Sequence, residues 1–362
     1  MLTTLIALLL QATAPNQPSP APKTPAPVKV WPTREAEYVA KAHRFIGGAT
    51  MNVRLHYTTL GSPHRNAAGE IDNAVLILHG TGGTGKQFLN PVFADDLYGP
   101  GQPLDITRYW IILPDNIGHG ASSKPSDGMR ATFPEYGYTD MVALQHRLVT
   151  EALGVRQLRL IFGTSMGCMH AFVWGETYPD AARALMPMAC EPVQIAGLNR
   201  MWRQMAIDAV KADPAWADGN YIAQPIQGLR TASSLLIVAG SAPLALQKTY
   251  PTRDAATAYV RDRLAKDIAT RDANDLIYQL DASRDYDPWG RLEAITAPVR
   301  WINSADDFIN PRGLPFPAEA VKRMKRATFR MIPEDETTRG HGTHTAASFW
   351  KADLAALLQQ TE

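Results

Sequence analysis

Short apolar runs alternate with amphipathic segments along much of the chain. The stretches "NAVLILHG", "RYWIILPD" and "LRLIFGTS" are compact apolar runs that end in glycine-rich or polar loops. Such runs are typical of strands buried on both faces. The stretch "YTDMVALQHRLVTEALGV" instead has apolar residues at helical spacing and ends at Gly154. Alternating strands and helices predict a mostly parallel sheet that helices cover on both faces.

Further elements extend this pattern at both ends of the region. The stretch "HRFIGGATMNVRLHYTTLG" predicts two strands joined by a Gly-Gly turn. A helix is expected from about Met166 to Tyr178, followed by a strand in "ARALMPMAC". Near the C-terminus, "APVRWINSADD" and "ATFRMIPE" predict two more strands, and "HTAASFWKADLAALLQQ" a final helix.

The alternation stops between residues 191 and 291. Helical patterns such as "RMWRQMAIDAV" and "AATAYVRDRLAKDIATRD" occupy this stretch, with no strong strand signal. An inserted helical cap explains why the sheet resumes only afterwards. The sequence therefore predicts an α/β core of residues 31–190 and 292–362, with a cap of residues 191–291.

The first thirty residues have a different composition. Residues 1–14 form an apolar segment ending in the small-x-small triplet Ala12-Thr13-Ala14, which resembles a secretory signal peptide. Residues 15–30 are rich in Pro and Ala, as in an extended linker. We therefore expect a secreted or periplasmic protein, with the cytoplasm as the alternative.

Composition and charge exclude several classes of protein. The 362 residues are 45% hydrophobic and 20% charged, and the net charge of +1 gives no reason to expect a nucleic-acid partner. After the N-terminal segment, no stretch approaches the roughly 18 apolar residues of a membrane span. The two cysteines, Cys168 and Cys190, offer no metal cluster. We expect them to be unpaired buried thiols, with a single disulfide as the alternative.

The sequence "GTSMG" places Ser165 between Gly163 and Gly167 at the end of a predicted strand. This is the G-x-S-x-G pattern of a nucleophile elbow, in which the serine sits on a strained strand-to-helix turn. A tight turn that needs small residues is the alternative explanation. Ligands of open parallel sheets bind beyond the carboxyl ends of the strands, where Ser165 would lie.

A serine nucleophile needs a histidine base, and three histidines compete for that role. His341 lies in a "GHG" triplet after the last predicted strand, where the order Ser, acid, His of this architecture requires the base. His119 lies in another "GHG" triplet before Ser165, and we expect it near the rim of the pocket. His344 is expected at the start of the final helix. We therefore select His341.

The acid that orients the histidine is expected after the strand "VRWINSADD". Asp307 precedes Pro311 by four residues, the usual spacing for the acid in this fold, so we prefer it. Asp306 remains the alternative, or it shapes the turn.

The oxyanion of an acyl-transfer intermediate needs two N–H donors. One is expected from Met166, which follows the nucleophile, and the other from Gly80 or Thr81 in the loop after "NAVLILHG". The same loop, "GTGGTGKQ", approaches a phosphate-binding loop, but Gln87 replaces the hydroxyl that would bind Mg²⁺. We therefore expect no nucleotide, no other cofactor and no metal.

With these residues in place, the chain from about Val39 onward resembles the α/β-hydrolase fold superfamily. Within it, "GTSMGCMHAFVWGETYPD", "MWRQMAIDAVKADPAWADGNY", "SADDFINP" and "GHG" are similar to the homoserine O-acetyltransferase group and its hydrolase relatives. The acetyltransferases carry an acidic residue where Gly342 stands and a glycine where Cys168 stands. The resemblance implies that a cap arginine holds a substrate carboxylate. Arg203 is the nearest match, together with Trp202, and Arg200 is a rival; a solvated helix face is the alternative.

The sequence thus predicts a serine hydrolase that cleaves a carboxylic ester, or a lactone or amide, through an acyl-enzyme. The first alternative is an O-acyltransferase of the homoserine O-acetyltransferase type that uses acyl-CoA. The second is a binding protein on an inactive hydrolase fold, against which the ordered Ser, Asp and His set argues. The expected partner is a small ester-like substrate, and a homodimer is left open.

Overall fold

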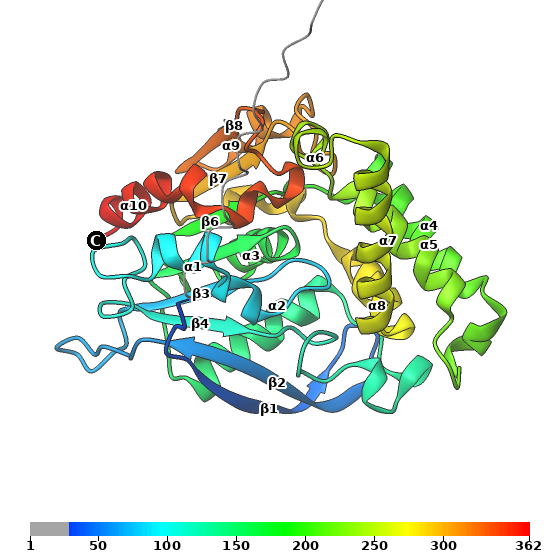
Figure 1. Cartoon of the computed structure of the whole chain (residues 1–362). Helices are drawn as coiled ribbons and strands as arrows, with labels where there is room; N and C mark the ends of the chain where they lie inside the picture. Colours follow the sequence, from blue (N-terminus) through cyan, green and yellow to red (C-terminus); the bar gives the residue numbers. More distant parts are fainter. Residues whose placement is uncertain (1–28) are drawn as a thin grey trace, which may run out of the picture. The chain divides into compact units, whose positions relative to one another are not determined.

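The computed structural model describes residues 29–362, so the expected signal peptide and nearly all of the linker lie outside the described residues. Residues 31–362 form one unit built around an eight-stranded sheet (Figure 1). The strand order is β1-β2-β4-β3-β5-β6-β7-β8. β2 runs antiparallel to both of its neighbours, whereas every other adjacent pair is parallel. This is the predicted α/β fold class. The strands are β1 Arg34–Arg44, β2 Thr50–Leu60, β3 Ala74–Leu78, β4 Trp110–Pro114, β5 Leu160–Thr164, β6 Leu185–Met188, β7 Val299–Ser304 and β8 Ala327–Ile332.

Helices cover both faces of the sheet. α2 and α3 lie on one face together with α9, and α1 and α10 lie on the other. Helices α4 to α8 follow β6 and form a separate group beside the sheet, on the right in Figure 1. The helices are α1 Pro91–Leu97, α2 Tyr138–Arg147, α3 Met166–Thr177, α4 Gly197–Lys211, α5 Ile226–Ala239, α6 Pro243–Thr249, α7 Arg253–Thr270, α8 Ala273–Asp281, α9 Phe316–Arg323 and α10 Lys351–Gln360.

The apolar strands supply two hydrophobic cores. Successive side chains of a strand point to opposite faces, so Leu76 and Leu78 of β3 pack with α2 and α3, whereas Val75 and Ile77 pack with α1 and α10. All four side chains are fully buried. This two-sided burial explains why the strand reads as an unbroken apolar run rather than an alternating one.

The helices between β6 and β7 have a hydrophobic cluster of their own. Buried side chains of α4, α5 and α8 form it, including Val210, Leu229 and Leu280. Among residues 29–362 no single helix is long and apolar enough to cross a membrane, although α5 and α6, bent by 103°, pass that test as a pair on length and composition.

Two expectations from the sequence are wrong. The final helix begins at Lys351 and not near His344, which lies in the short 3₁₀ segment Gly340–Thr345. Cys168 and Cys190 are not free thiols, because they form a disulfide with their Cα atoms 5.9 Å apart. Cys168 lies in the first turn of α3 and Cys190 just after β6, so the bond ties the helix behind Ser165 to the neighbouring strand.

Candidate active site

Ser165 stands on a sharp turn between β5 and α3. Its backbone φ of 54° and ψ of −112° are rare for a residue with a side chain. Two glycines make this turn possible: a Cβ on Gly163 would lie 1.9 Å from the carbonyl oxygen of Gly167, and a Cβ on Gly167 would lie 2.1 Å from that of Leu78. Sterically, the G-x-S-x-G pattern is therefore a requirement of this turn.

The structure brings together the three residues expected to form the triad. Nε2 of His341 lies 2.8 Å from Oγ of Ser165, and Nδ1 of the same ring lies 2.8 Å from Oδ2 of Asp307. The Asp307 carboxylate is fully buried, and the His341 side chain is only 13% exposed. The three side chains are therefore arranged as a serine nucleophile, a histidine base and an acid that orients the histidine must be.

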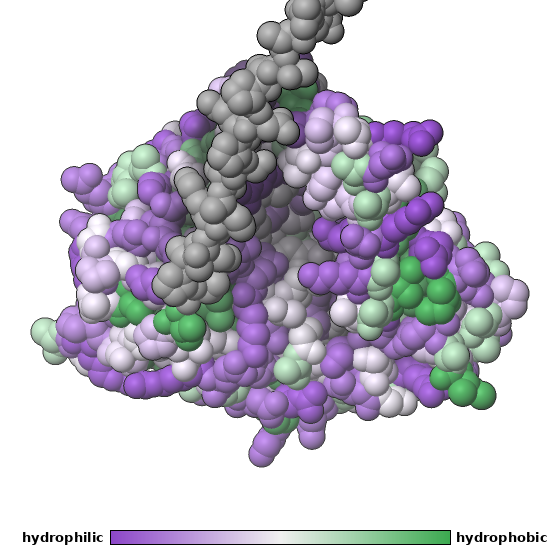
Figure 2. Space-filling view, in the orientation of Figure 1, coloured by the Kyte–Doolittle hydropathy of each residue, from purple (hydrophilic) through white to green (hydrophobic). Residues whose placement is uncertain are grey.

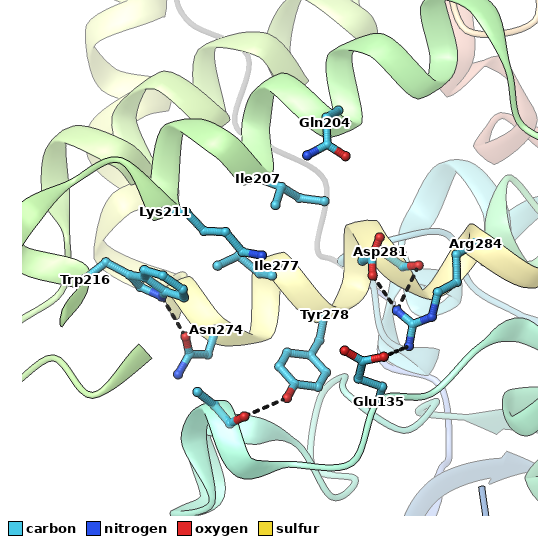
Figure 3. A pocket seen from close by; sticks show the side chains of 11 residues that line it. Glu135, Gln204, Ile207, Lys211, Trp216, Asn274, Ile277, Tyr278, Asp281 and Arg284 are labelled. Carbon is cyan, nitrogen blue, oxygen red and sulfur yellow. Dashed lines mark hydrogen bonds and ion pairs between the residues drawn. The ribbon is translucent and has the colours of Figure 1, made fainter. Parts of the chain in front are cut away.

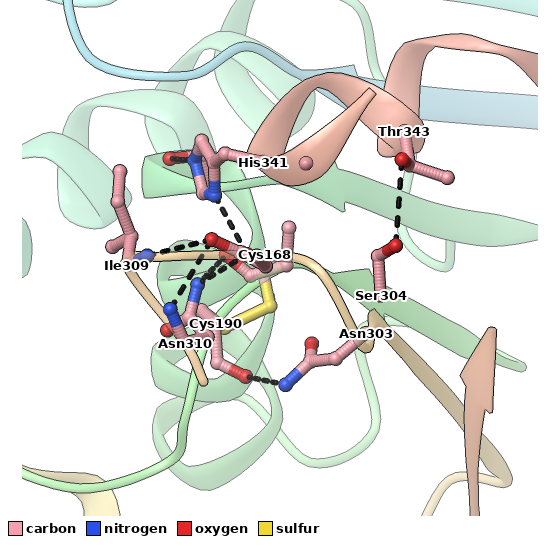
Figure 4. A network of polar contacts seen from close by, with 12 residues as sticks. Cys168, Cys190, Asn303, Ser304, Ile309, Asn310, His341 and Thr343 are labelled. Atoms are coloured by element: carbon pink, nitrogen blue, oxygen red, sulfur yellow. Dashed lines mark hydrogen bonds and ion pairs between the residues drawn. A yellow bond between two sulfur atoms is a disulfide. The ribbon is translucent and has the colours of Figure 1, made fainter. Parts of the chain in front are cut away.

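Asp307 is held by donors on each side of its carboxylate, and two of the residues that supply them, Ile309 and Asn310, are labelled in Figure 4. Oδ1 accepts the main-chain N–H groups of Ile309 and Asn310, and Oδ2 accepts Nδ2–H of Asn310 at 2.9 Å. Burial by itself would raise the pKa of Asp307, but His341 and these donors outweigh it and lower the pKa below the usual value. Asn310 was not singled out from the sequence, although it lies in the same "SADDFINP" segment.

The neighbouring Asp306 faces the loop that carries His341. Its Oδ2 accepts the main-chain N–H of Gly340 at 2.8 Å and the hydroxyl of Thr338 at 2.8 Å. Its other oxygen accepts the hydroxyl of Ser304. Asp306 therefore fixes the approach of the histidine loop and does not contact the imidazole.

The other two candidate histidines have different surroundings. His119 is not at the rim of a pocket, as expected, but is fully buried, and burial together with His79 lowers its pKa to about 3. Burial, with a contribution from His341, also lowers the pKa of His344 to about 3. His119 is therefore a neutral, buried structural group, whereas the partly exposed His344 packs edge-on against His341, with the ring centres 5.3 Å apart. Neither histidine hydrogen-bonds to Ser165.

The loop Gly80–Gly83, called the oxyanion loop below, lies against Ser165. A Cβ on Gly80 would lie 3.2 Å from Cβ of the serine, a tight contact that a larger residue could make only if Ser165 shifted slightly. Met166 is the first residue of α3, where main-chain N–H groups have no partner within the helix. In the part of this loop that resembles a phosphate-binding loop, Lys86 pairs with Glu35 at 2.7 Å.

Two of the cap residues singled out from the sequence are buried. Arg203 is 2% exposed and its Cζ lies 4.8 Å from the ring centre of Trp202. Its guanidinium donates to Oδ1 of Asn199 at 3.0 Å and to the carbonyl of Leu280 at 3.5 Å, but no carboxylate within residues 29–362 pairs with it. A solvated helix face is therefore wrong for Arg203. Arg200, 37% exposed and 3.5 Å from Asp281, does lie on such a face.

Arg203 connects with the oxyanion loop through Tyr138. Burial raises the pKa of the Tyr138 hydroxyl, while the neighbouring Arg203 acts in the opposite direction, as does the Thr81 side chain. Within residues 29–362 the buried Oη of Tyr138, Oγ1 of Thr81 and Nε1 of Trp202 make no hydrogen bond of ordinary geometry, although the Tyr138 hydroxyl lies close to both Thr81 and Arg203. Buried polar atoms rarely remain unpaired, so this group of atoms is suited to contact a polar ligand.

A separate cavity of about 350 Å³ lies between α4, α8 and the segment 131–135 (Figure 3). Its charged groups largely pair with one another: Arg284 contacts Asp281 and Glu135. No member of the triad lines it. Within residues 29–362 no cluster of three or more His, Cys, Asp or Glu side chains could hold a metal ion.

Residues 73–337 match the family model of the alpha/beta hydrolase fold. The chain therefore belongs to the alpha/beta hydrolase fold family, as the sequence patterns indicated, and is an enzyme of that superfamily.

The proteins that this chain is similar to include both acyltransferases and an ester hydrolase. A probable acyltransferase of Methanothermobacter thermautotrophicus is 30% identical over 67% of this chain and 73% of its own. A homoserine O-acetyltransferase of Solidesulfovibrio magneticus is 38% identical over 48% of this chain, and the match spans only 46% of that enzyme. The solved structure of an acetylester hydrolase from Corynebacterium glutamicum superimposes with a TM-score of 0.78, at 22% identity, over 90% of this chain and 96% of that one. At that identity the structural likeness shows the fold alone, and the relatives leave both hydrolysis and acyl transfer open.

Proposed function

We propose that the protein is a serine hydrolase that cleaves a carboxylic ester through an acyl-enzyme. The observation that carries the proposal is the continuous hydrogen-bonded series of Ser165, His341 and Asp307 at the elbow. Ser165 is the nucleophile, His341 the general base and acid, and Asp307 the group that fixes the histidine tautomer.

In the first half-reaction, Oγ of Ser165 attacks the ester carbonyl carbon while Nε2 of His341 takes its proton. The main-chain N–H groups of Met166 and Thr81 stabilise the resulting oxyanion. The imidazolium, held by Asp307, then gives its proton to the leaving alkoxide as the C–O bond breaks. In the second half-reaction a water molecule attacks the acyl-enzyme while His341 takes its proton. The imidazolium then returns this proton to Oγ of Ser165 as the bond to the acyl carbon breaks and the carboxylic acid leaves.

We propose that Arg203 and Trp202 line the substrate pocket. The guanidinium of Arg203 is buried without a carboxylate partner. Burying a cation in this way is costly unless an anion offsets it, so a substrate that carries a carboxylate would fit. The buried hydroxyls of Thr81 and Tyr138, which lie between this arginine and the oxyanion loop, offer further hydrogen bonds to such a substrate.

Water is the proposed acyl acceptor, with an acyl-CoA-dependent transferase as the second candidate. Two features favour water. The buried disulfide is typical of proteins in oxidising compartments, which supports a secreted or periplasmic location where acyl-CoA is not expected. In addition, Gly342 follows His341 where the acetyltransferases carry an acidic residue. In favour of transfer stand the acyltransferase names of the sequence relatives.

The two candidates are separated by the fate of the acyl group. Purified protein is incubated with p-nitrophenyl acetate, and in parallel with acetyl-CoA and homoserine, while acetate, free thiol and O-acetylhomoserine are followed. We expect ester hydrolysis without O-acetylhomoserine; efficient transfer without hydrolysis of simple esters would establish the transferase instead.

The nucleophile is tested by Ser165→Ala, since alanine fits the same backbone and removes only Oγ. Turnover should fall by about 10⁴- to 10⁶-fold, and labelling by a fluorophosphonate should disappear, while the circular dichroism spectrum stays that of the unmodified protein. Near-normal turnover in a folded variant would disprove the role of Ser165.

A further inference from the structure

A buried series of hydrogen bonds leads from α3 to the oxyanion loop. Nε1–H of Trp174 donates to Oε1 of Gln145 at 2.7 Å, and Nε2–H of Gln145 donates to Oδ1 of Asn116 at 2.5 Å. Asn116 in turn donates to Nε2 of His79 at 3.1 Å, both from its main-chain N–H and from its side-chain amide. Each of these four side chains is at most 2% exposed. The series joins residues of α3 and α2 with those that follow β4 and β3.

These partners allow His79 one tautomer. Nε2 faces the main-chain N–H of Asn116, which can only donate, so Nε2 carries no proton. Nδ1 lies 2.9 Å from the carbonyl oxygen of Gly80, which can only accept, so Nδ1 carries the proton. Burial lowers the pKa of His79, which keeps the ring neutral.

The carbonyl of Gly80 is therefore fixed from two sides, by Nδ1–H of His79 and by the main-chain N–H of Gly83 at 3.0 Å. In a trans peptide the C=O and the following N–H point in opposite directions, and the described chain contains no cis peptide bond. Fixing this oxygen consequently fixes the direction of the Thr81 N–H. No acceptor within residues 29–362 takes that N–H group.

We propose that Asn116 and Gln145 are positioning residues for oxyanion stabilisation. Together with the main-chain N–H of Asn116, their amides hold the neutral His79 ring in the orientation in which Nδ1–H reaches the Gly80 carbonyl. Through that carbonyl they aim the N–H of Thr81 at the developing oxyanion. Neither residue lines the triad or touches the reacting atoms. The inference rests on the proposed acyl-transfer chemistry of Ser165, and it assigns a role to two side chains that no step of the reaction uses directly.

Gln145 belongs to this series because both its amide oxygen and its amide nitrogen are hydrogen-bonded. Its oxygen accepts from Trp174, and its nitrogen faces both Oδ1 of Asn116 and Nδ1 of His170, the latter at 3.0 Å. This fixes which end of the Asn116 amide is the oxygen and which donates to His79. Without Gln145 the Asn116 amide would be free to turn its oxygen toward Nε2, where two acceptors would repel.

Asn116→Leu tests the proposal, because leucine is close to asparagine in size and removes the amide. Steady-state kinetics with p-nitrophenyl acetate and the inhibition constant of phenylboronic acid, which forms a tetrahedral adduct on a serine, are measured together. We expect kcat to fall about 10- to 100-fold, less than or similar to the loss of a whole oxyanion donor. KM should change little, while the affinity for phenylboronic acid should fall in parallel with kcat.

Asn73→Leu is the matched control. Asn73 is also buried, donates to the carbonyls of Ser62 and Arg108, and directly precedes β3, the strand whose other end carries His79. This variant should lose stability but keep kcat and phenylboronic acid affinity. An equal loss in both variants, or wild-type kinetics in a folded Asn116→Leu protein, would overturn the proposal.

Two further measurements keep the test decisive. ¹⁵N NMR of histidine-labelled protein should show His79 protonated at Nδ1, and an Nε2–H tautomer would refute the proposal. If Asn116→Leu does not fold, Gln145→Met takes its place with the same expected pattern and the same contradicting outcomes. If the proposed hydrolase function itself is wrong, the result differs from failure of this inference. In that case the unmodified protein would neither hydrolyse the ester nor bind a fluorophosphonate at Ser165.

Discussion

At the scale of single residues, two adjacent aspartates have different tasks. Asp307 contacts Nδ1 of His341, whereas Asp306 binds main-chain and hydroxyl donors of the loop that carries this histidine. The two carboxylates are neighbours in sequence, yet backbone geometry after β7 turns one toward the imidazole and the other toward Gly340. Substitutions at the two positions should therefore have unequal effects.

Asp307→Asn should lower kcat by about 10⁴-fold, because the amide can donate to Nδ1 and so favours the wrong histidine tautomer. Asp306→Asn should lower it by about tenfold or less, since an amide oxygen still accepts from Gly340. Ester hydrolysis by both variants, with circular dichroism as the folding control, distinguishes the two. The reverse ranking would identify Asp306 as the acid.

At the scale of elements, the disulfide joins α3 to the segment just after β6, next to the loop that carries Ile309 and Asn310 (Figure 4). The carbonyl of Cys190 accepts Nε1–H of Trp301 and Nδ2–H of Asn303, both on β7. Nδ2–H of Asn310 donates to the carbonyl of Ala189, which precedes Cys190. The bond thus connects the element that carries Ser165 with the strand end against which the Asp307 loop packs.

Replacing both cysteines by alanine should therefore lower the free energy of unfolding by about 3 kcal/mol, the effect typical of closing a loop of this length. Urea denaturation, with and without dithiothreitol, measures the difference. The reductant should destabilise the unmodified protein once unfolding exposes the bond, and should leave the double variant unchanged. Reactive thiols in unmodified protein denatured without reductant would show that the bond does not form.

At the scale of the whole molecule, Glu191 makes stability depend on pH. It lies where the chain leaves β6 for the cap. Its Oε1 accepts from Asn303, and its Oε2 is buried without a hydrogen-bond partner among residues 29–362. Burial, together with the nearby Asp307, raises the pKa of Glu191 to about 8. The usual value is 4.5, so between these two pH values the folded protein keeps a proton that the unfolded chain has lost. The contribution of Glu191 to the free energy of unfolding therefore falls as the pH rises through this window.

Glu191→Gln should remove this part of the pH dependence, because glutamine is neutral throughout. We expect the drop in melting temperature between about pH 5.5 and about pH 8.5 to be smaller in this variant than in the unmodified protein. Glu319→Gln, at an exposed position of α9, is the control and should not change that drop. Parallel melting curves for the unmodified protein and Glu191→Gln across the range would contradict the assignment.

That the protein forms a homodimer stays a prediction. Hydrophilic residues dominate the face shown in Figure 2, with apolar residues in separate groups. On α4, Leu198, Met201 and Met205 are about half exposed at helical spacing, which is compatible with a homodimer. The location of the protein and the boundaries of the cap also stay predictions.

Much of the fold and the triad could be read from the sequence because their determinants are local. A strand buried on both faces needs an unbroken apolar run, as in β3, β4 and β5. The turn at Ser165 admits only glycine two residues to either side, so the elbow leaves a short and readable pattern. The order of strands then places Asp307 and His341 after the last two strands of the sheet.

What only the tertiary structure decided depends on residues distant in sequence. Cys168 and Cys190 are separated by 22 positions, and only the pairing of β5 with β6 brings their Cα atoms within reach of a bond. The burial of Arg203 depends on which side of α4 faces the core, and the series from Trp174 to His79 needs four elements at once. Strands and tight turns depend on residues that are neighbours in sequence, so a short stretch is enough to predict them. The partner of a buried polar group depends on how distant elements pack, so no single stretch of sequence predicts it.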